Sequence, residues 1–402
     1  MADLFDKFKD LERDHAALVE AAGSDPLGIR VDRLHSATEA DIAGRRCILL
    51  GSNNYLGLTF DAEAIAAGQQ ALADAGTGTT GSRVANGSYG GHQDLEAQLA
   101  DFFGCPHAVL FSTGYQANVG VLSAIAGADD TLLIDSDCHA SIYDGCKLGN
   151  ATVLRFRHND ARDLERRLRR LQQPERALVV IEGIYSMLGD RAPVAEIAEV
   201  TKRHGAYLLV DEAHSLGVLG SSARGVAQEA GVEDQVDFIV GTFSKSVGTV
   251  GGFCVSKHRV LEAIRLSARA YLFTASLPPS VVATAASTLA RIAREPELRE
   301  RLWRNADIVY DGLAEMGFHL GPEKTPVIGV RMESMERGLL AWQTLMEHGI
   351  YVNLALPPAT PGGGCLLRCS VCAEHTPEQL HRVLDAFSAV RETLAMPPQA
   401  AE

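Results

Sequence analysis

The chain has 402 residues, of which 46% are hydrophobic and 22% charged, an ordinary globular composition that can fill one large core or a large domain with a smaller companion. Its formal net charge of −14 argues against nucleic-acid binding, because phosphate groups would repel it. It has no apolar run long enough to span a bilayer and no signal-peptide core, so we expect a cytoplasmic protein without an integral membrane segment.

The N-terminal segment, residues 1–56, is expected to form a helical arm. Leu4, Phe8, Leu11 and Leu18 recur at helical spacing within a charged stretch. This pattern predicts a helix packed on the body of the protein or on a partner subunit. Weak peripheral contact with a membrane surface is the alternative.

Residues 57–291 alternate short apolar runs with amphipathic helices such as 160–171 and 193–204. The expected strands are 107–111, 131–135, 151–156, 177–182, 206–211, 237–242 and 251–256. Such alternation predicts an α/β fold with a mostly parallel sheet covered on both faces. Ligands of such sheets bind at the carboxyl ends of the strands, so a catalytic site is expected there.

A proline pair, Pro278 and Pro279, precedes a long helical stretch over about 280–315, and residues 292–402 are expected to form a smaller domain. Cys365, Cys369 and Cys372 have a spacing that can bind an iron–sulfur cluster. The surrounding CLLRCSVCA is densely apolar, which favours a buried strand with cysteine as a small core residue. We therefore expect free thiols and no metal site.

A lysine, Lys245, lies in VGTFSKSVGTVGG with Thr242 and Ser244 beside it. Hydroxyls and glycine-rich backbone suit a phosphate, and a lysine next to them suits a Schiff base to an aldehyde cofactor. The alternative is a flexible loop with a surface lysine. The next motif weighs against that alternative.

Asp211 ends an apolar strand in DEAHS, and His214 follows it. A pyridoxal ring needs a carboxylate against its pyridinium nitrogen, and a histidine nearby can hydrogen-bond its phenolic oxygen. A lone aspartate at a strand end is usually a cap or a turn residue. Together with Lys245, however, it predicts a pyridoxal 5'-phosphate (PLP) enzyme.

Two further segments each follow an expected strand. In STGYQAN, Gly114 and Tyr115 begin a helix whose N–H groups can hold the phosphate. In SDCHASIYDG, His139 can stack on the cofactor ring.

With these motifs in place, the chain resembles the α-oxoamine synthases of the fold-type I PLP-dependent transferases. The residues of its motifs are most similar to those of the bacterial serine palmitoyltransferases. The matching segments are SNNYLGL (52–58), GTGTTGSR (76–83), FSTGYQAN (111–118), CHASIYDG (138–145), EGIYSMLGD (182–190), VDEAHSLG (210–217), GTFSKSVGTVGG (241–252), FTASLPPS (273–280), PPATP and LLRCSVCAEHTP. The resemblance implies a large domain with a mostly parallel seven-stranded sheet, a smaller α+β C-terminal domain and an N-terminal helical arm.

The resemblance also implies residue roles. Catalytic roles fall on Lys245, His139, Asp211 and His214. Cofactor contacts fall on those residues and on Gly114, Tyr115, Ser186, Thr242, Ser244 and, from a partner subunit, Thr274. Substrate contacts fall on Asn54, approaching from the partner, and on Arg368, which matches the family's carboxylate-binding arginine.

The implied reaction is the decarboxylating condensation of L-serine with a long-chain acyl thioester, palmitoyl-CoA, in a homodimer, giving 3-ketodihydrosphingosine. The donor could equally be an acyl-carrier-protein thioester. Alternatives are the synthases of 2-amino-3-ketobutyrate, 8-amino-7-oxononanoate or 5-aminolevulinate, another PLP chemistry such as transamination, or a non-catalytic partner subunit. One position departs from the serine palmitoyltransferase pattern. Leu356 precedes PPATP where an arginine can stand, which leaves the substrate carboxylate to Arg368 and His139.

Overall fold

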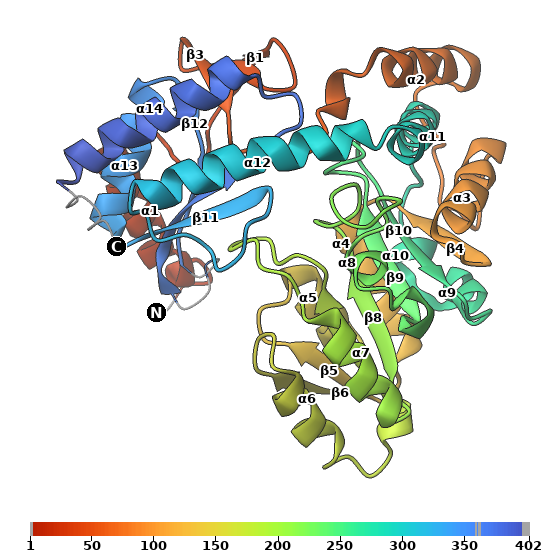
Figure 1. Ribbon diagram of the computed structural model, residues 1–402. Coiled ribbons are helices and arrows are strands. Elements are labelled where there is room, and N and C mark those ends of the chain that lie inside the picture. Colours follow the sequence, from red (N-terminus) through yellow and green to blue (C-terminus); the bar gives the residue numbers. More distant parts are fainter. Residues whose placement is uncertain (1–2, 358–359, 361–362, 396–402) are drawn as a thin grey trace. The chain divides into compact units, whose positions relative to one another are not determined.

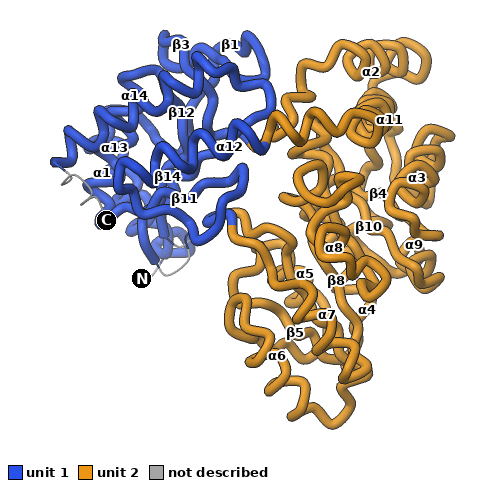
Figure 2. The backbone as a smooth tube through the Cα atoms, in the orientation of Figure 1, with its two compact units in different colours: residues 1–52, 187–189, 303–402 blue, residues 53–186, 190–302 orange. Residues whose placement is uncertain are grey.

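The computed structural model describes residues 3–357, 360 and 363–395, drawn as a ribbon in Figure 1. The chain divides into two compact units, coloured separately in Figure 2. Unit 1 comprises residues 1–52, 187–189 and 303–402, and unit 2 comprises residues 53–186 and 190–302. Unit 1 therefore combines most of the N-terminal segment with most of the C-terminal one.

Unit 2 is built on a seven-stranded sheet in the order β4-β10-β9-β8-β7-β5-β6. Its strands are β4 (His107–Phe111), β5 (Thr131–Asp135), β6 (Thr152–Phe156), β7 (Ala177–Glu182), β8 (Tyr207–Asp211), β9 (Phe238–Thr242) and β10 (Gly252–Ser256). β10 is antiparallel to both neighbours and the other pairs are parallel. The predicted mostly parallel seven-stranded sheet is confirmed, with every strand starting within one residue of its expected position.

Helices cover both faces of this sheet, because alternate residues of the central strands are buried on opposite sides. On one face, Leu132, Val180 and Leu209 join a core with residues of α4 and α9. On the other face, Val179 and Leu208 are also buried. The helices of unit 2 are α2 (Ala62–Ala75), α3 (Gly90–Phe103), α4 (Gly114–Ile125), α5 (Ala140–Leu148), α6 (Ala161–Leu168), α7 (Val194–Arg203), α8 (Val226–Glu229), α9 (Leu261–Ser267), α10 (Arg269–Leu272) and α11 (Pro279–Arg294), with the 3-10 turns η2 (Leu58–Phe60), η3 (Pro174–Arg176) and η4 (Glu233–Gln235).

The parallel register brings polar strand ends to one edge of the sheet. Glu182, the last residue of β7, pairs with Asp211, the last residue of β8. Asp135 ends β5 and Thr242 ends β9. Four polar side chains from four strands therefore meet where a parallel sheet binds its ligand.

Unit 1 holds two small sheets, in the orders β1-β2-β3-β12 and β11-β14-β13. Its strands are β1 (Val31–Leu34), β2 (Glu39–Ile42), β3 (Arg45–Leu49), β11 (Val327–Met332), β12 (Ile350–Tyr351), β13 (Asn353–Ala355) and β14 (Cys365–Ser370). Its helices are η1 (Asp6–Phe8), α1 (Lys9–Ala22), α13 (Met335–Glu347) and α14 (Pro377–Thr393), together with the part of α12 (Glu297–Glu315) that lies beyond Leu302. All six residues of β14 are buried, so the buried strand expected at CLLRCSVCA is confirmed.

The predicted N-terminal helix is present as α1, but only its C-terminal end packs on unit 1. Leu18 and Ala22 are buried in the core of that unit. Leu4, Phe8 and Leu11 remain exposed. Among the described residues, no helix is both long enough and apolar enough to cross a membrane.

Candidate active site

A pocket of about 270 Å³ opens at the carboxyl ends of the strands in unit 2. It is lined by Thr113, Gly114, Tyr115, Asn118, His139, Ser141, Glu182, Asp211, Ala213, His214, Gly241, Thr242, Ser244, Lys245, Val250 and Gly251. Eight of the twelve residues that the sequence assigned to the site are among them. Larger hollows lie elsewhere on unit 2, but this pocket collects an amine, a buried carboxylate and a helix N-terminus in one place.

The loop after β9 presents Lys245 to the pocket. The Thr242 hydroxyl donates to the carbonyl of Gly251 (2.8 Å). The Ser244 hydroxyl lies 2.8 Å from the Thr242 hydroxyl. The N–H of Gly248 donates to the carbonyl of Lys245 (2.9 Å), in a turn that needs the left-handed φ of +77° at this glycine. The lysine is therefore held at its backbone while its side chain stays half-buried.

The N-terminus of helix α4 lies beside the hydroxyls of Thr242 and Ser244. Thr113 caps the helix by accepting a hydrogen bond from the N–H of Gln116 (3.1 Å). A Cβ on Gly114 would lie 2.7 Å from the Cβ of Thr242, so only glycine allows this close approach. The N–H groups of a helix's first turn, beside two hydroxyls, suit an anion such as a phosphate.

Asp211 is 5% exposed at the end of β8, and both of its carboxylate oxygens accept hydrogen bonds. Asn118 Nδ2 donates to one oxygen (2.7 Å) and the N–H of Ala213 to the other (2.9 Å). Asn118 also donates to Ser141 Oγ (3.0 Å), which ties α4 to α5. The carboxylate therefore has a fixed direction in the pocket.

His139 enters the pocket from the loop between β5 and α5. Its backbone N–H donates to the Glu182 carboxylate, and its Nδ1 accepts from the N–H of Ser141 (3.2 Å). Burial lowers the pKa of His139; the charge of Asp211 opposes this effect and that of Lys245 adds to it, and the net direction is downward, which favours the neutral ring. Burial, followed by the charge of Asp211, raises the pKa of Glu182 well above its usual range.

His214 is buried and its orientation is fixed by Tyr55. The Tyr55 hydroxyl lies 2.7 Å from His214 Nδ1, and both side chains are almost inaccessible to solvent. Tyr55, Asn118 and Glu182 stand within the sequence motifs, but no role was predicted for them. The one feature of the sequence that could have pointed to these three residues is their position within or beside a cofactor-binding motif.

Four predicted residues do not line this pocket. Asn54 donates to Thr59 Oγ1 (2.7 Å), and Thr274 accepts from Gln116 Nε2 (3.1 Å). Ser186 lies in the loop after β7. Arg368 belongs to unit 1, where it is buried in β14 and donates to Ser370 Oγ (2.8 Å).

The segment after Leu356 is only partly covered by the structure. Leu356 packs against the core of unit 1. Pro358, Ala359 and Pro361 of the PPATP segment lie outside the described residues.

Residues 45–387 match the family model described as aminotransferase class I and II. The chain is 54% identical to a serine palmitoyltransferase of Caulobacter vibrioides, covering 98% of this chain and 97% of that protein. It is 35% identical to an 8-amino-7-oxononanoate synthase of Lysinibacillus sphaericus, covering 92% and 95%.

Solved structures agree with the sequence relatives. A serine palmitoyltransferase of Sphingomonas wittichii superimposes with a TM-score of 0.96 at 52% identity, covering 99% of this chain and all of that one. A serine palmitoyltransferase from S. paucimobilis, a lysine-to-alanine variant with bound PLP and myriocin, gives the same TM-score at 51% identity, covering 98% of this chain and all of that one. The chain belongs to the aminotransferase class I and II family and, within it, to the α-oxoamine synthases that its sequence resembles.

Proposed function

We propose that this protein is a PLP-dependent acyltransferase that condenses L-serine with a long-chain acyl thioester, palmitoyl-CoA, to give 3-ketodihydrosphingosine and carbon dioxide, the first step of sphingolipid synthesis. The observation that carries the proposal is the pocket that gathers Lys245, Asp211 and the N-terminus of α4 in a chain 54% identical to a serine palmitoyltransferase.

The residues present fit PLP as the cofactor. The close approach of Gly114 to Thr242 brings the N–H groups at the start of α4 beside the Ser244 hydroxyl, and these donors suit its phosphate. Lys245 supplies the amine that its aldehyde requires, and the buried Asp211 supplies an anion for its ring nitrogen. The phosphate end and the ring end of the pocket thus carry complementary donors and acceptors.

When bound, PLP supplies an electron sink that stabilises negative charge on the α-carbon of the amino acid. Asp211 would keep the ring nitrogen protonated, and His214, oriented by Tyr55, would hydrogen-bond the phenolic oxygen. Lys245 would hold the cofactor and, once displaced by serine, would take the α-proton as general base. His139, neutral and flat, would stack on the ring.

Serine must also be held by its carboxylate. In a partly desolvated pocket a carboxylate needs charged or hydrogen-bonded partners, and Arg368 and His139 are the proposed ones. Leu356 offers none, so Arg368 should provide most of that binding.

We propose that the working form is a cytoplasmic homodimer. Thr274 lies outside the pocket of its own chain, next to the exposed Phe273, which fits the implied contribution of Thr274 to the site of a partner subunit. The exposed Leu4, Phe5 and Leu11 support a second contact, with a partner subunit or a membrane surface.

The test is mass spectrometry of the products that purified enzyme makes from serine, glycine or alanine with several acyl thioesters. Serine with palmitoyl-CoA should give the highest kcat/KM, and a carrier-protein thioester should be compared with CoA in the same assay. A preference for glycine or alanine would overturn the proposal in favour of another α-oxoamine synthase, such as the 8-amino-7-oxononanoate synthase that is 35% identical.

A further inference from the structure

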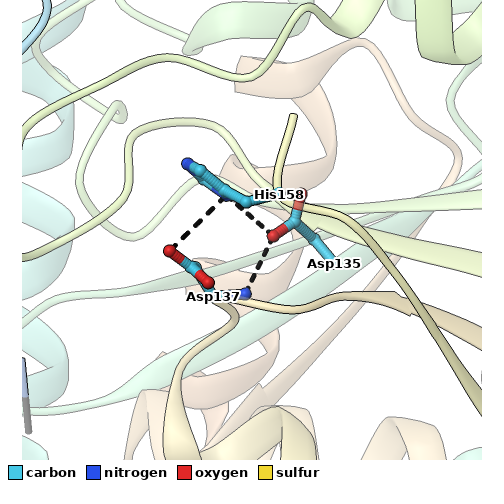
Figure 3. A group of neighbouring side chains, drawn as sticks. All are labelled: Asp135, Asp137 and His158. Atoms are coloured by element: carbon cyan, nitrogen blue, oxygen red, sulfur yellow. Dashed lines mark hydrogen bonds and ion pairs between the residues drawn. The ribbon is translucent and has the colours of Figure 1, made fainter. Parts of the chain in front are cut away.

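Next to the pocket, loops that follow three neighbouring strands meet at one histidine, His158. It follows β6, and its Nδ1 lies 2.8 Å from the carboxylate of Asp135 at the end of β5. Its Nε2 lies 2.6 Å from the carboxylate of Asp190, beyond the end of β7. Figure 3 shows the ring of His158 beside Asp135 and Asp137. Asp135 and Asp190 are buried, whereas the side chain of His158 keeps 25% exposure.

The two contacts fix the charge of the ring. Carboxylates only accept hydrogen bonds, so both nitrogens of His158 must donate and the ring is an imidazolium. Burial alone would lower the pKa of His158, but the hydrogen bonds with Asp135 and Asp190 outweigh it and raise the pKa to about 10. Asp135, Asp137 and His158 are residue types that can hold a metal ion, yet a ring protonated on both nitrogens has no lone pair for one.

The next residue reinforces the same bridge. Asn159 has a left-handed φ of 53°, which asparagine tolerates better than most residues. Its N–H donates to Asp135 (2.8 Å) and its side-chain amide to Asp190 (3.0 Å). A single turn after β6 therefore holds both buried carboxylates.

Each of the two aspartates in turn fixes a loop of the pocket, Asp135 through its carboxylate and Asp190 through its backbone carbonyl. Asp135 also accepts from the N–H of Asp137 (2.9 Å), in the turn that leads to His139. The backbone carbonyl of Asp190 accepts from the N–H of Tyr185 (2.9 Å), which closes the loop that begins after Glu182. His139 and Glu182 are themselves hydrogen-bonded within the pocket.

We propose that His158 is a positioning residue for the active site: by bridging Asp135 and Asp190, its ring holds the loop that carries His139 in register with the loop that follows Glu182. It does not line the pocket and acts through His139. The kinetic part of its test rests on the proposed function, whereas the exchange part does not.

The experiment compares His158→Gln with a matched control, His258→Gln. His258 also pairs with a carboxylate, Asp237 (2.7 Å), and is 35% exposed, but it lies at the opposite end of the sheet. Hydrogen–deuterium exchange in residues 136–139 and 183–186 should be about tenfold faster or more in His158→Gln and unchanged in the control. Serine should bind about tenfold more weakly by spectral titration of the holoenzyme, with the KM for the acyl donor unchanged.

The inference is overturned if His158→Gln keeps the wild-type exchange and serine Kd and loses only thermal stability. Should this variant not fold, Asp190→Asn keeps the shape of the bridge and should give smaller changes in the same direction, and wild-type values there would equally overturn it. Faster exchange in an enzyme that does not condense serine would refute the proposed function and leave the positioning role supported.

Discussion

Replacing Asp211 with asparagine would remove one negative charge from the pocket and almost no volume. The new side-chain oxygen could keep the hydrogen bond from the N–H of Ala213. The new amide nitrogen would face Asn118, whose Oδ1 is buried and has no hydrogen-bond partner in the described part of the chain. Rotating the amide of Asn118 would turn that oxygen toward the new donor, so the substitution should test charge rather than shape.

The expected loss follows from the buried position of Asp211. Removing one partner of a buried ion pair costs about 3–5 kcal/mol, here the pair proposed between Asp211 and the cofactor ring nitrogen. Since about 1.4 kcal/mol is a factor of ten, kcat should fall by about 10² to 5 × 10³. Product mass spectrometry at saturating serine and palmitoyl-CoA gives kcat, and a thermal melt should show that the fold is retained.

Asp237→Asn is the matched control. Asp237 also accepts a backbone N–H, that of Leu208 (2.8 Å), but at the other end of the sheet. Its kcat should stay close to that of the wild type. Wild-type turnover by Asp211→Asn would refute the assigned role, and an equal loss in both variants would attribute the effect to folding.

Four other outcomes are expected. Borohydride treatment followed by peptide mapping should place the reduced cofactor on Lys245, and a label on another lysine would contradict the assignment. Arg368→Ala should raise the KM for serine and cost roughly 2–5 kcal/mol in kcat/KM, whereas Leu356→Arg should have a smaller effect; a near-neutral Arg368→Ala would mean that the carboxylate is held elsewhere. A mixed dimer with Lys245→Ala in one chain and Thr274→Val in the other should retain one intact site. A fully active monomer, detected by sedimentation, would rule out active sites shared between two chains. Burial lowers the pKa of His375 to about 4, from about 6.5 in the unfolded chain, so the unfolded state binds the extra proton between these values. Stability should therefore fall by about 3 kcal/mol as pH drops from 6.5 to 4, and melting temperatures of His375→Gln should lack this part of the decline.

The sequence was most informative where local pattern determines structure. Runs such as ALVVIE are apolar at every position except the last, which is acidic, so both the strand and its polar carboxyl end could be predicted. Lys245 and Asp211 could be assigned because their chemistry is specific and each has a motif around it.

What the sequence could not predict depends on distant contacts. Asn118 meets Asp211 across 93 positions and Tyr55 meets His214 across 159, distances over which residue spacing carries no information. The long helical stretch expected over about 280–315 is divided into two helices, α11 and α12, because Pro296 follows α11 and cannot donate a backbone hydrogen bond.

The pairing of β3 with β12 also constrains how this protein can be made. Ile48 lies beside Ile350 in a parallel pair, and Asn353 donates to the carbonyl of Gly51 across 302 positions. At about 5–20 residues per second, a ribosome needs roughly 15–60 seconds between these two segments. Throughout that interval the edge of β3 has no strand beside it, and such an edge is a template for wrong pairing. Unit 1 can therefore be completed only after almost the whole chain has emerged, whereas every residue of unit 2 is synthesised earlier. Nascent chains of this protein thus present an open sheet edge to chaperones late in synthesis, and truncation before residue 350 leaves that edge open permanently.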